Sequence, residues 1–275
     1  MKTVPVSVII PCYNCCDTIE RAALSVVNQT VCPAEVFFIN DASTDNTLHR
    51  LFELQKKYGK TWIKVISLPQ NQGPGAARNA GWNQSSEPYL AFLDADDAWH
   101  PEKINFQYDW MKKSPDVAVT SHRCVQLAPH YSVWDLPQNH IAYSLKAFRL
   151  LIWNQMLTRS VMLHQKSKSF QVLPFRFPED KRVSEDYFLW LEMVLNGVKS
   201  WYLDIPLAAS FKSSYGEGGL SCDLVAMEKG ELDTYRRLWR KNLLTTTLTI
   251  GLYGFSLIKH LRRMIIHWTR GKHGL

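Results

Sequence analysis

The first 100 residues alternate between short apolar segments and longer helix-like ones, and this alternation restricts the fold more than any other feature of the sequence. We expect buried strands at residues 6–10, 36–40, 62–67 and 89–93. The helices between them should end near residues 28, 58 and 83. Strands separated by helices of this length form right-handed βαβ units. The sequence therefore predicts an α/β fold with a Rossmann-like, mostly parallel sheet and helices on both faces.

One of these apolar runs, at residues 89–93, ends in three closely spaced carboxylates, Asp94, Asp96 and Asp97. They should lie at the C-terminal edge of the sheet, where open α/β sheets bind ligands. Carboxylates at this spacing repel one another unless a cation is present, and Mg²⁺ or Mn²⁺ typically joins one or two carboxylates to a diphosphate. The pattern predicts a divalent metal site at Asp96, Asp94 and Asp97. An acidic turn without a ligand is the alternative.

The composition is that of a folded protein whose positive charge lies in its last part. Of the 275 residues, 46% are hydrophobic and 21% charged, and the formal net charge is +7. From Thr234 onward there are nine Lys and Arg residues and no acidic residue. The rest of the chain is slightly acidic and lacks the broad basic face of a nucleic-acid-binding protein, so we expect no nucleic-acid partner. The six cysteines do not form a disulfide framework, which is typical of a reducing compartment.

Five segments, read in order, resemble family 2 glycosyltransferases of the GT-A fold, which move a sugar from a nucleotide diphosphate donor to an acceptor. The segments are VSVIIPCYN at 6–14, INDASTDNT at 39–47, GPGAARNAG at 73–81, FLDADD at 92–97 and SED at 184–186. Two positions depart from the family pattern, because Asn40 replaces the first Asp of the usual pair and Ala42 replaces a Gly. The Gln-x-x-Arg-Trp motif of processive synthases is absent from the C-terminal part, which favours single-addition chemistry.

The resemblance implies roles for three sets of residues. Asp186 is expected to act as the catalytic base of an inverting transfer, with Glu185 beside it at the start of a helix. The metal, Mn²⁺ or Mg²⁺, is expected at Asp96, Asp94 and Asp97. The nucleotide sugar, most simply a UDP-sugar, is expected to contact Pro11, Tyr13, Asn14, Asp41, Arg78, Asp94 and Ala95. Arg78 near a helix start also suits a phosphate or an acidic base edge, although a surface arginine would look the same.

The C-terminal part predicts attachment to a membrane surface. Residues 243–258 are uncharged but contain four threonines, and they fall short of the ~20 residues that a spanning helix needs. A helical wheel of residues 257–270 separates apolar side chains from basic ones. The apolar side holds Leu257, Ile258, Leu261, Met264, Ile265 and Trp268, and the basic side Lys259, His260, Arg262, Arg263, His267 and Arg270. Such a helix lies in the plane of an anionic leaflet. The alternative is a helix that packs on the rest of the protein and exposes its basic face.

These observations together predict three regions and a location. Residues 1–115 should form the nucleotide-sugar-binding half of a GT-A domain, residues 116–220 its acceptor-binding and catalytic half, and residues 221–275 the C-terminal helices. No signal peptide opens the chain, so we expect a cytoplasmic enzyme, peripheral at the inner face of the plasma membrane. The expected acceptor is a glycan or a polyprenyl-diphosphate-linked glycan in cell-surface polysaccharide synthesis, lipopolysaccharide included.

Three other functions share parts of this pattern. A polyprenyl-phosphate sugar transferase would carry the same N-terminal motifs. A non-catalytic protein that binds nucleotide sugars would keep the fold, but the retained Asp94, Asp96 and Asp186 argue against it. A nucleotidyltransferase is disfavoured because the loop after the first strand, PCYNCCDT, has neither a glycine nor a basic residue for a triphosphate.

Overall fold

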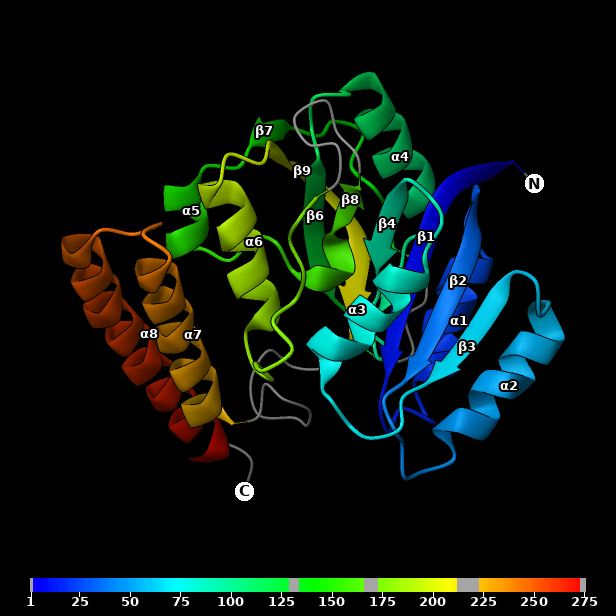
Figure 1. The fold of residues 1–275 in the computed structure, drawn as a ribbon, viewed down its shortest axis with the longest axis horizontal. Coiled ribbons are helices and arrows are strands. Elements are labelled where there is room, and N and C mark those ends of the chain that lie inside the picture. The colour runs from blue at the N-terminus through cyan, green and yellow to red at the C-terminus, as the bar shows by residue number, and fades with distance from the viewer. Residues whose placement is uncertain (1, 129–133, 166–172, 212–222, 273–275) are drawn as a thin grey trace.

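The computed structural model describes residues 2–128, 134–165, 173–211 and 223–272. Figure 1 shows one central sheet with helices on both faces and two long helices side by side at one end of the molecule. The strands are β1 (Thr3–Cys12), β2 (Cys32–Asn40), β3 (Ile63–Ser67), β4 (Tyr89–Phe92), β5 (Ala98–Trp99), β6 (Val119–Gln126), β7 (Ala142–Ser144), β8 (Met162–His164) and β9 (Ser200–Ser210). The helices are α1 (Ile19–Val27), α2 (Thr47–Tyr58), α3 (Pro74–Gln84), α4 (Lys103–Lys113), α5 (Ala147–Ile152), α6 (Glu185–Leu195), α7 (Leu224–Arg240) and α8 (Thr246–Lys272), with a 3₁₀ turn η1 (Thr158–Ser160). The predicted α/β fold with a helical C-terminal part is confirmed.

Within the described residues, nine strands form one sheet in the order β3-β2-β1-β4-β8-β6-β9-β5, and β7 also pairs with β9. Strand β1 is parallel to β2 and to β4, and β2 is parallel to β3, as predicted. Beyond β4 the sheet is mixed, because β8 pairs antiparallel with both β4 and β6. The sheet continues from residues 1–115 into residues 116–220 without a break. The predicted boundary at residue 220 lies outside the described residues.

Alternate side chains of the central strands enter two hydrophobic clusters on opposite faces of the sheet. In β1, Ile9 belongs to the cluster that contains α3 and α6, whereas Val8 and Ile10 belong to the cluster that contains α1, α2 and α4. Successive strand side chains point to opposite faces, so a sheet covered on both faces needs apolar residues at every position. This is why β1 and β2 appear in the sequence as continuous apolar runs.

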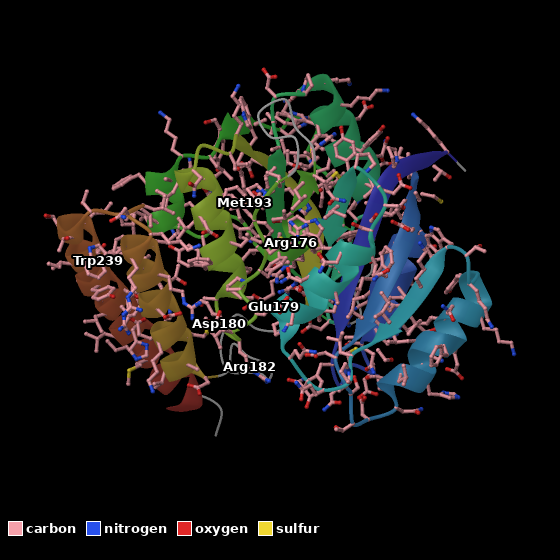
Figure 2. The ribbon with its side chains drawn as sticks, in the orientation of Figure 1. Arg176, Glu179, Asp180, Arg182, Met193 and Trp239 are labelled. Atoms are coloured by element: carbon pink, nitrogen blue, oxygen red, sulfur yellow. The ribbon has the colours of Figure 1, made fainter. Side chains whose placement is uncertain are left out.

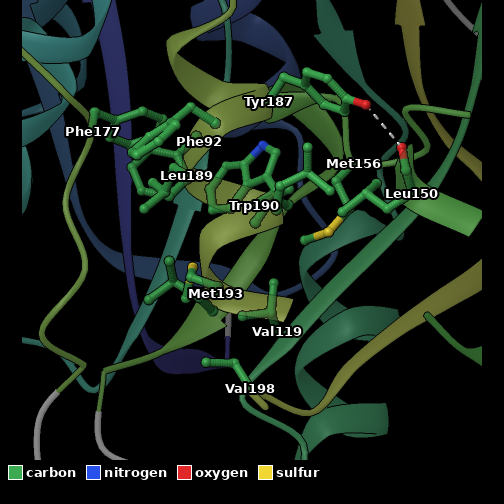
Figure 3. Packing of buried hydrophobic residues seen from close by; sticks show 14 of the residues in the cluster. Phe92, Val119, Leu150, Met156, Phe177, Tyr187, Leu189, Trp190, Met193 and Val198 are labelled. Atoms are coloured by element: carbon green, nitrogen blue, oxygen red, sulfur yellow. Dashed lines mark hydrogen bonds between the residues drawn. The ribbon is translucent and has the colours of Figure 1, made fainter. Parts of the chain in front are cut away.

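Helix α6 is held by aromatic packing in the first of these clusters (Figure 3). The ring of Trp190 lies 5.5 Å from that of Phe177 and 6.3 Å from that of Phe92, measured between ring centroids. The hydroxyl of Tyr187 donates to the carbonyl of Leu150 at 3.3 Å. The helix is followed by Gly197, which takes a left-handed φ of 82°. Because the body of α6 is fixed, the positions of its first residues are fixed as well.

The last two helices lie side by side and antiparallel, as Figure 1 shows. Helix α7 begins after Asp223, whose carboxylate accepts from the backbone N–H of Ala226 at 2.8 Å. Helix α8 begins at Thr246, so the threonine-rich segment and the predicted amphipathic segment form one continuous helix. In the part of the chain that the structure describes, no helix is both long enough and apolar enough to cross a membrane.

Candidate active site

Helix α3 packs against β1 and against the start of α6, and two glycines permit this approach. A Cβ on Gly81 would lie 2.7 Å from Cγ2 of Ile9, and one on Gly75 would lie 3.2 Å from Cγ of Glu185. No side chain fits at Gly81 without displacing Ile9. These two glycines of the 73–81 segment therefore bring α3, with Arg78 in its middle, close to the C-terminal edge of the parallel strands.

Arg78 forms a buried bridge between Asp94 and Glu185. Its Nη2 donates to Oδ1 of Asp94 at 2.8 Å, and its Nη1 donates to Oε1 of Glu185 at 2.7 Å. Arg78 as a residue is only 6% exposed. Burial alone would lower the pKa of Arg78, but the two carboxylates outweigh it and raise that pKa. Arg78 thus joins the donor half of the predicted site to the catalytic half.

The carboxylates that follow β4 do not all point to the same place. Asp97 is buried, and its Oδ2 lies 3.1 Å from Nη1 of Arg159, a residue that the sequence motifs do not include. Asp94 and Asp96 are partly exposed. Among the described residues, no group of three or more His, Cys, Asp or Glu side chains is close enough to hold a metal ion. Asp97 is therefore engaged by Arg159, and of the three carboxylates Asp94 and Asp96 lie at the surface of the site.

Burial shifts the pKa of two of these acidic groups toward neutrality. It raises the pKa of Asp97 to about 7, although the Arg159 guanidinium opposes the shift. It also raises the pKa of Glu185 to about 7, assisted by the neighbouring Asp186 and opposed by Arg78. Near neutral pH, the charge of the site therefore depends on which cations lie next to these two groups.

Asp186 is held at both carboxylate oxygens at the first turn of α6. Its Oδ1 accepts from the N–H of Tyr187 at 2.7 Å, and its Oδ2 accepts from the hydroxyl of Thr158 at 2.9 Å. Asp186 is partly exposed while its neighbour Glu185 is buried. Of the predicted acidic pair, Asp186 is thus the residue that is accessible to solvent, and Glu185 pairs with Arg78.

Asp41 holds the loop that leads into α3. Its two carboxylate oxygens accept from the backbone N–H groups of Gln72 and Gly73, both at 2.8 Å, and the side chain is buried. The departures at its neighbours have local consequences. Ala42 takes a left-handed φ of 53°, where the family glycine would be unstrained, and the Asn40 side chain accepts from the N–H of Ser43 at 3.2 Å. The predicted contact of Asp41 with a nucleotide base stays a prediction.

The loop after β1 is joined to the loop after β2 through Asn14. The Asn14 side chain accepts from the N–H of Thr44 at 2.8 Å, and the Asn14 N–H donates to the hydroxyl of Ser43 at 3.1 Å. Tyr13 beside it is half exposed, with 49% of its surface accessible. Pro11 is partly buried and Ala95 is buried. These residues of the predicted nucleotide site thus lie at the ends of β1 and β4, where Tyr13 is exposed and Asn14 holds the loops together.

The segment at residues 173–184 ties the start of α6 to both sides of the molecule. Figure 2 shows Arg176, Glu179, Asp180 and Arg182 along it. On one side, Asn79 of α3 donates to the carboxylate of Glu179 at 3.0 Å. On the other side, Arg237 of α7 donates to the carboxylate of Asp180 at 2.9 Å. The C-terminal helices thus help to position α6 and the two acidic residues at its start.

The sequence did not point to the side chains on the 3₁₀ turn η1. Thr158 contacts Asp186, and Arg159 contacts Asp97 and approaches Asp94, with Nη1 and Oδ2 4.0 Å apart. A Thr-Arg pair carries no recognisable motif. The one available signal was an arginine in a mostly apolar segment ahead of β8.

Comparison with known proteins identifies the class first. The structure of TarS residues 1–349 from S. aureus in complex with UDP-GlcNAc matches 95% of this chain and 73% of that chain, with a TM-score of 0.68 and 20% identity. Mannosyltransferase PcManGT from Pyrobaculum calidifontis, in complex with GDP-Man and Mn²⁺, matches 98% of this chain and 79% of that chain, with a TM-score of 0.63 and 14% identity. The fold is therefore of the GT-A glycosyltransferase type.

Sequence comparison then gives the family. The model of glycosyl transferase family 2 matches residues 7–169. A glycosyltransferase from Haemophilus influenzae is 30% identical over 211 residues, which cover 75% of this chain and 78% of the relative. The Escherichia coli UDP-Glc:alpha-D-GlcNAc-diphosphoundecaprenol beta-1,3-glucosyltransferase WfgD is 28% identical over 196 residues, 69% of each chain. This chain belongs to glycosyl transferase family 2, as its motifs predicted.

Proposed function

We propose that this glycosyltransferase transfers a sugar from a UDP-sugar to a polyprenyl-diphosphate-linked glycan, with inversion and with Asp186 as the base. The observation that carries the proposal is the Arg78 bridge, because it joins Asp94 at the end of β4 to Glu185 beside Asp186. The names of two similar proteins support the substrates: the E. coli relative uses UDP-Glc and a diphosphoundecaprenol acceptor, and TarS binds UDP-GlcNAc. Cell-surface polysaccharide synthesis, including lipopolysaccharide, is the corresponding process.

In this proposal the reaction is a single displacement. The Asp186 carboxylate takes the proton of the acceptor hydroxyl as that oxygen bonds to the anomeric carbon. The bond from this carbon to the diphosphate breaks at the same time, and its electron pair leaves with the UDP. Asp186 suits the role because it is partly exposed and is oriented through both of its oxygens.

Asp94 and Asp96 fit a divalent cation, since both are hard oxygen donors at the surface of the site. Asp97 fits it less well because its side chain is only 4% exposed, against 25% for that of Asp94. Mn²⁺ or Mg²⁺, when bound, would neutralise charge on the diphosphate leaving group. We therefore propose Asp94 and Asp96 as the ligands from this chain.

We expect UDP to raise the melting temperature in a Mn²⁺-dependent way. A ligand at 100 times its dissociation constant adds about 2.7 kcal/mol, which is a shift of several degrees for a chain of this size. The measurement is a melting curve with UDP, GDP or CMP, each with and without Mn²⁺, on the wild type and on Asp96→Ala. Loss of the Mn²⁺-dependent part in Asp96→Ala is expected. No shift with any nucleotide would contradict the proposal.

We also propose that α8 attaches the enzyme to an anionic membrane surface. The described outer face of α8 is apolar, with exposed Ile250, Leu257, Ile258, Leu261, Met264 and Ile265. The basic side chains divide: Lys259 and Arg263 pair with the buried Glu231 of α7, while Arg262 is exposed. The exposed positions of α7 add Arg236, Trp239 and Arg240. The alternative prediction, a solvated basic face, fits poorly because the exposed side chains of α8 are mainly apolar.

A second copy of this chain suits the same face less well, since it would bring arginines against arginines, whereas an anionic leaflet would complement them. Attachment there would keep the protein peripheral and give its active site access to a lipid-linked acceptor. A polyprenyl-phosphate sugar transferase would have the same need, so acceptor assays must separate the two.

We expect the double variant Ile258→Gln and Leu261→Gln to bind vesicles of phosphatidylglycerol and phosphatidylcholine at least about tenfold more weakly than the wild type, because each side chain loses apolar burial worth ~2 kcal/mol. Co-sedimentation of the full chain measures the binding. Ile141→Gln is the matched control. Ile141 lies outside the helix, and its exposed fraction of 68% matches the 67% of Ile258. Equal binding of the double variant and the control would contradict the proposal.

A further inference from the structure

The 3₁₀ turn η1 places a buried hydroxyl against the proposed base. Thr158 is 3% exposed, and its Oγ1 donates to Oδ2 of Asp186 at 2.9 Å. Threonine hydroxyls in turns commonly bond to nearby backbone carbonyls. The bond of Thr158 instead reaches a residue 28 positions away in the chain. The Thr158 hydroxyl thus donates its hydrogen bond to the Asp186 side chain and not to a carbonyl of its own turn.

The turn itself is held from several directions, so the position of the hydroxyl is well defined. Within it, the N–H of Ser160 donates to the carbonyl of Leu157 at 2.8 Å. From outside, the indole of Trp99 donates to the carbonyl of Arg159 at 2.8 Å, and the amide of Gln107 donates to the carbonyl of Ser160 at 2.9 Å. A donor fixed in this way can select one orientation of the carboxylate that it binds.

The residue next to Thr158 contacts the other half of the site. Nη1 of Arg159 lies 3.1 Å from Oδ2 of Asp97, in the acidic segment after β4. One short turn therefore contacts both the base at the start of α6 and the carboxylates at the end of β4. The relative position of these two groups matters for a displacement reaction, because the attacking oxygen must be in line with the bond that breaks.

We propose that Thr158 is a positioning residue for Asp186. Its hydroxyl fixes Oδ2, and the N–H of Tyr187 fixes Oδ1, so the carboxylate is held with one lone pair of each oxygen still available to the acceptor hydroxyl. Neither bond forms or breaks in the reaction. The inference rests on the proposed function, because it assumes that Asp186 is the base.

The test compares Thr158→Val, which keeps the shape and removes the donor, with Thr158→Ser, which keeps the donor. UDP release is followed with the UDP-sugar that is turned over fastest among UDP-glucose, UDP-galactose, UDP-N-acetylglucosamine and UDP-N-acetylgalactosamine, with Mn²⁺ and with water as acceptor. Thr158→Val should lower kcat about tenfold, the effect of losing a hydrogen bond to a charged group, with KM for the donor and the UDP-induced melting shift unchanged. Thr158→Ser should restore most of kcat.

Ser160→Ala is the matched control because it removes another buried hydroxyl from the same turn, one that donates to the carbonyl of Leu157 at 2.7 Å and does not contact Asp186. Its kcat should equal that of the wild type even if its melting temperature falls. A Thr158→Val variant with wild-type kcat, measured beside an impaired Asp186→Asn variant, would overturn the positioning role alone. If Asp186→Asn is fully active, or if no UDP-sugar is turned over, the proposed function fails first and the positioning role with it.

Discussion

Asp186→Asn is expected to lower kcat by about 10²–10⁴, the usual contribution of a general base, while the enzyme still binds UDP. The amide has the size of the carboxylate and keeps an oxygen for the Thr158 hydroxyl, but it cannot take a proton at neutral pH. The variant should therefore fold and show the wild-type melting shift with UDP. The measurement is UDP release from the most active UDP-sugar, with kcat and KM determined separately.

Glu192→Gln is the control for this variant. Glu192 lies on the same helix, but its carboxylate pairs with Lys241 at the far end of α6. Removing this charge should leave kcat unchanged, although stability can fall. A kcat of Asp186→Asn within about threefold of the wild type would rule out Asp186 as the base, because so small a change lies far below the effect of a general base.

The first four strands were predictable because each is a local pattern of apolar residues with turn residues at its ends. Strands β1 and β2 begin earlier than predicted, at Thr3 and Cys32, because their polar or proline-containing starts pair with each other in the sheet. The order β8-β6-β9 could not be derived in the same way. It depends on pairing between segments far apart in the chain, such as Val119 with Leu163, which no local pattern encodes.

The motif residues of the candidate site can be named from the sequence, but their partners in the fold cannot. The sequence identified Arg78, Asp94 and Glu185 separately, and only the fold joins them in one bridge. In the C-terminal helix, a helical wheel separates basic from apolar residues but does not say which side faces the protein. The buried carboxylate of Glu231 decides this by drawing Lys259 and Arg263 inward, which leaves the apolar side chains outside.

Arg78→Met should have a larger effect on stability than the other substitutions considered. It removes a buried cation and leaves Glu185 without its partner, and breaking a buried ion pair in this way costs about 3–5 kcal/mol. The free energy of unfolding, measured by urea denaturation, should fall by this amount above pH 7. Donor turnover should be lost as well, because Asp94 and Glu185 are no longer joined.

The pH dependence of this loss follows from Glu185. Burial already raises its pKa to about 7 while Arg78 opposes the shift, so removing Arg78 raises that pKa further. A carboxyl group whose pKa is higher in the folded protein than in the unfolded chain favours the folded state while it is protonated. The protein loses this stability as pH rises from the unfolded pKa to the folded pKa. The stability difference between Arg78→Met and the wild type should therefore be smallest near pH 5 and largest near pH 8.

Two further variants separate the lost ion pair from lost packing. Adding Glu185→Gln to Arg78→Met should recover stability at pH 8, because it removes the uncompensated charge. Arg176→Met is the matched control: the Arg176 guanidinium binds the carbonyls of Leu173 and Phe175 and lies 4.3 Å from the Trp82 ring, and no carboxylate of the described residues pairs with it. Its loss of stability should be independent of pH between 5 and 8. A pH-independent loss in Arg78→Met as well would mean that packing, and not the Asp94–Arg78–Glu185 bridge, makes Arg78 important for the fold.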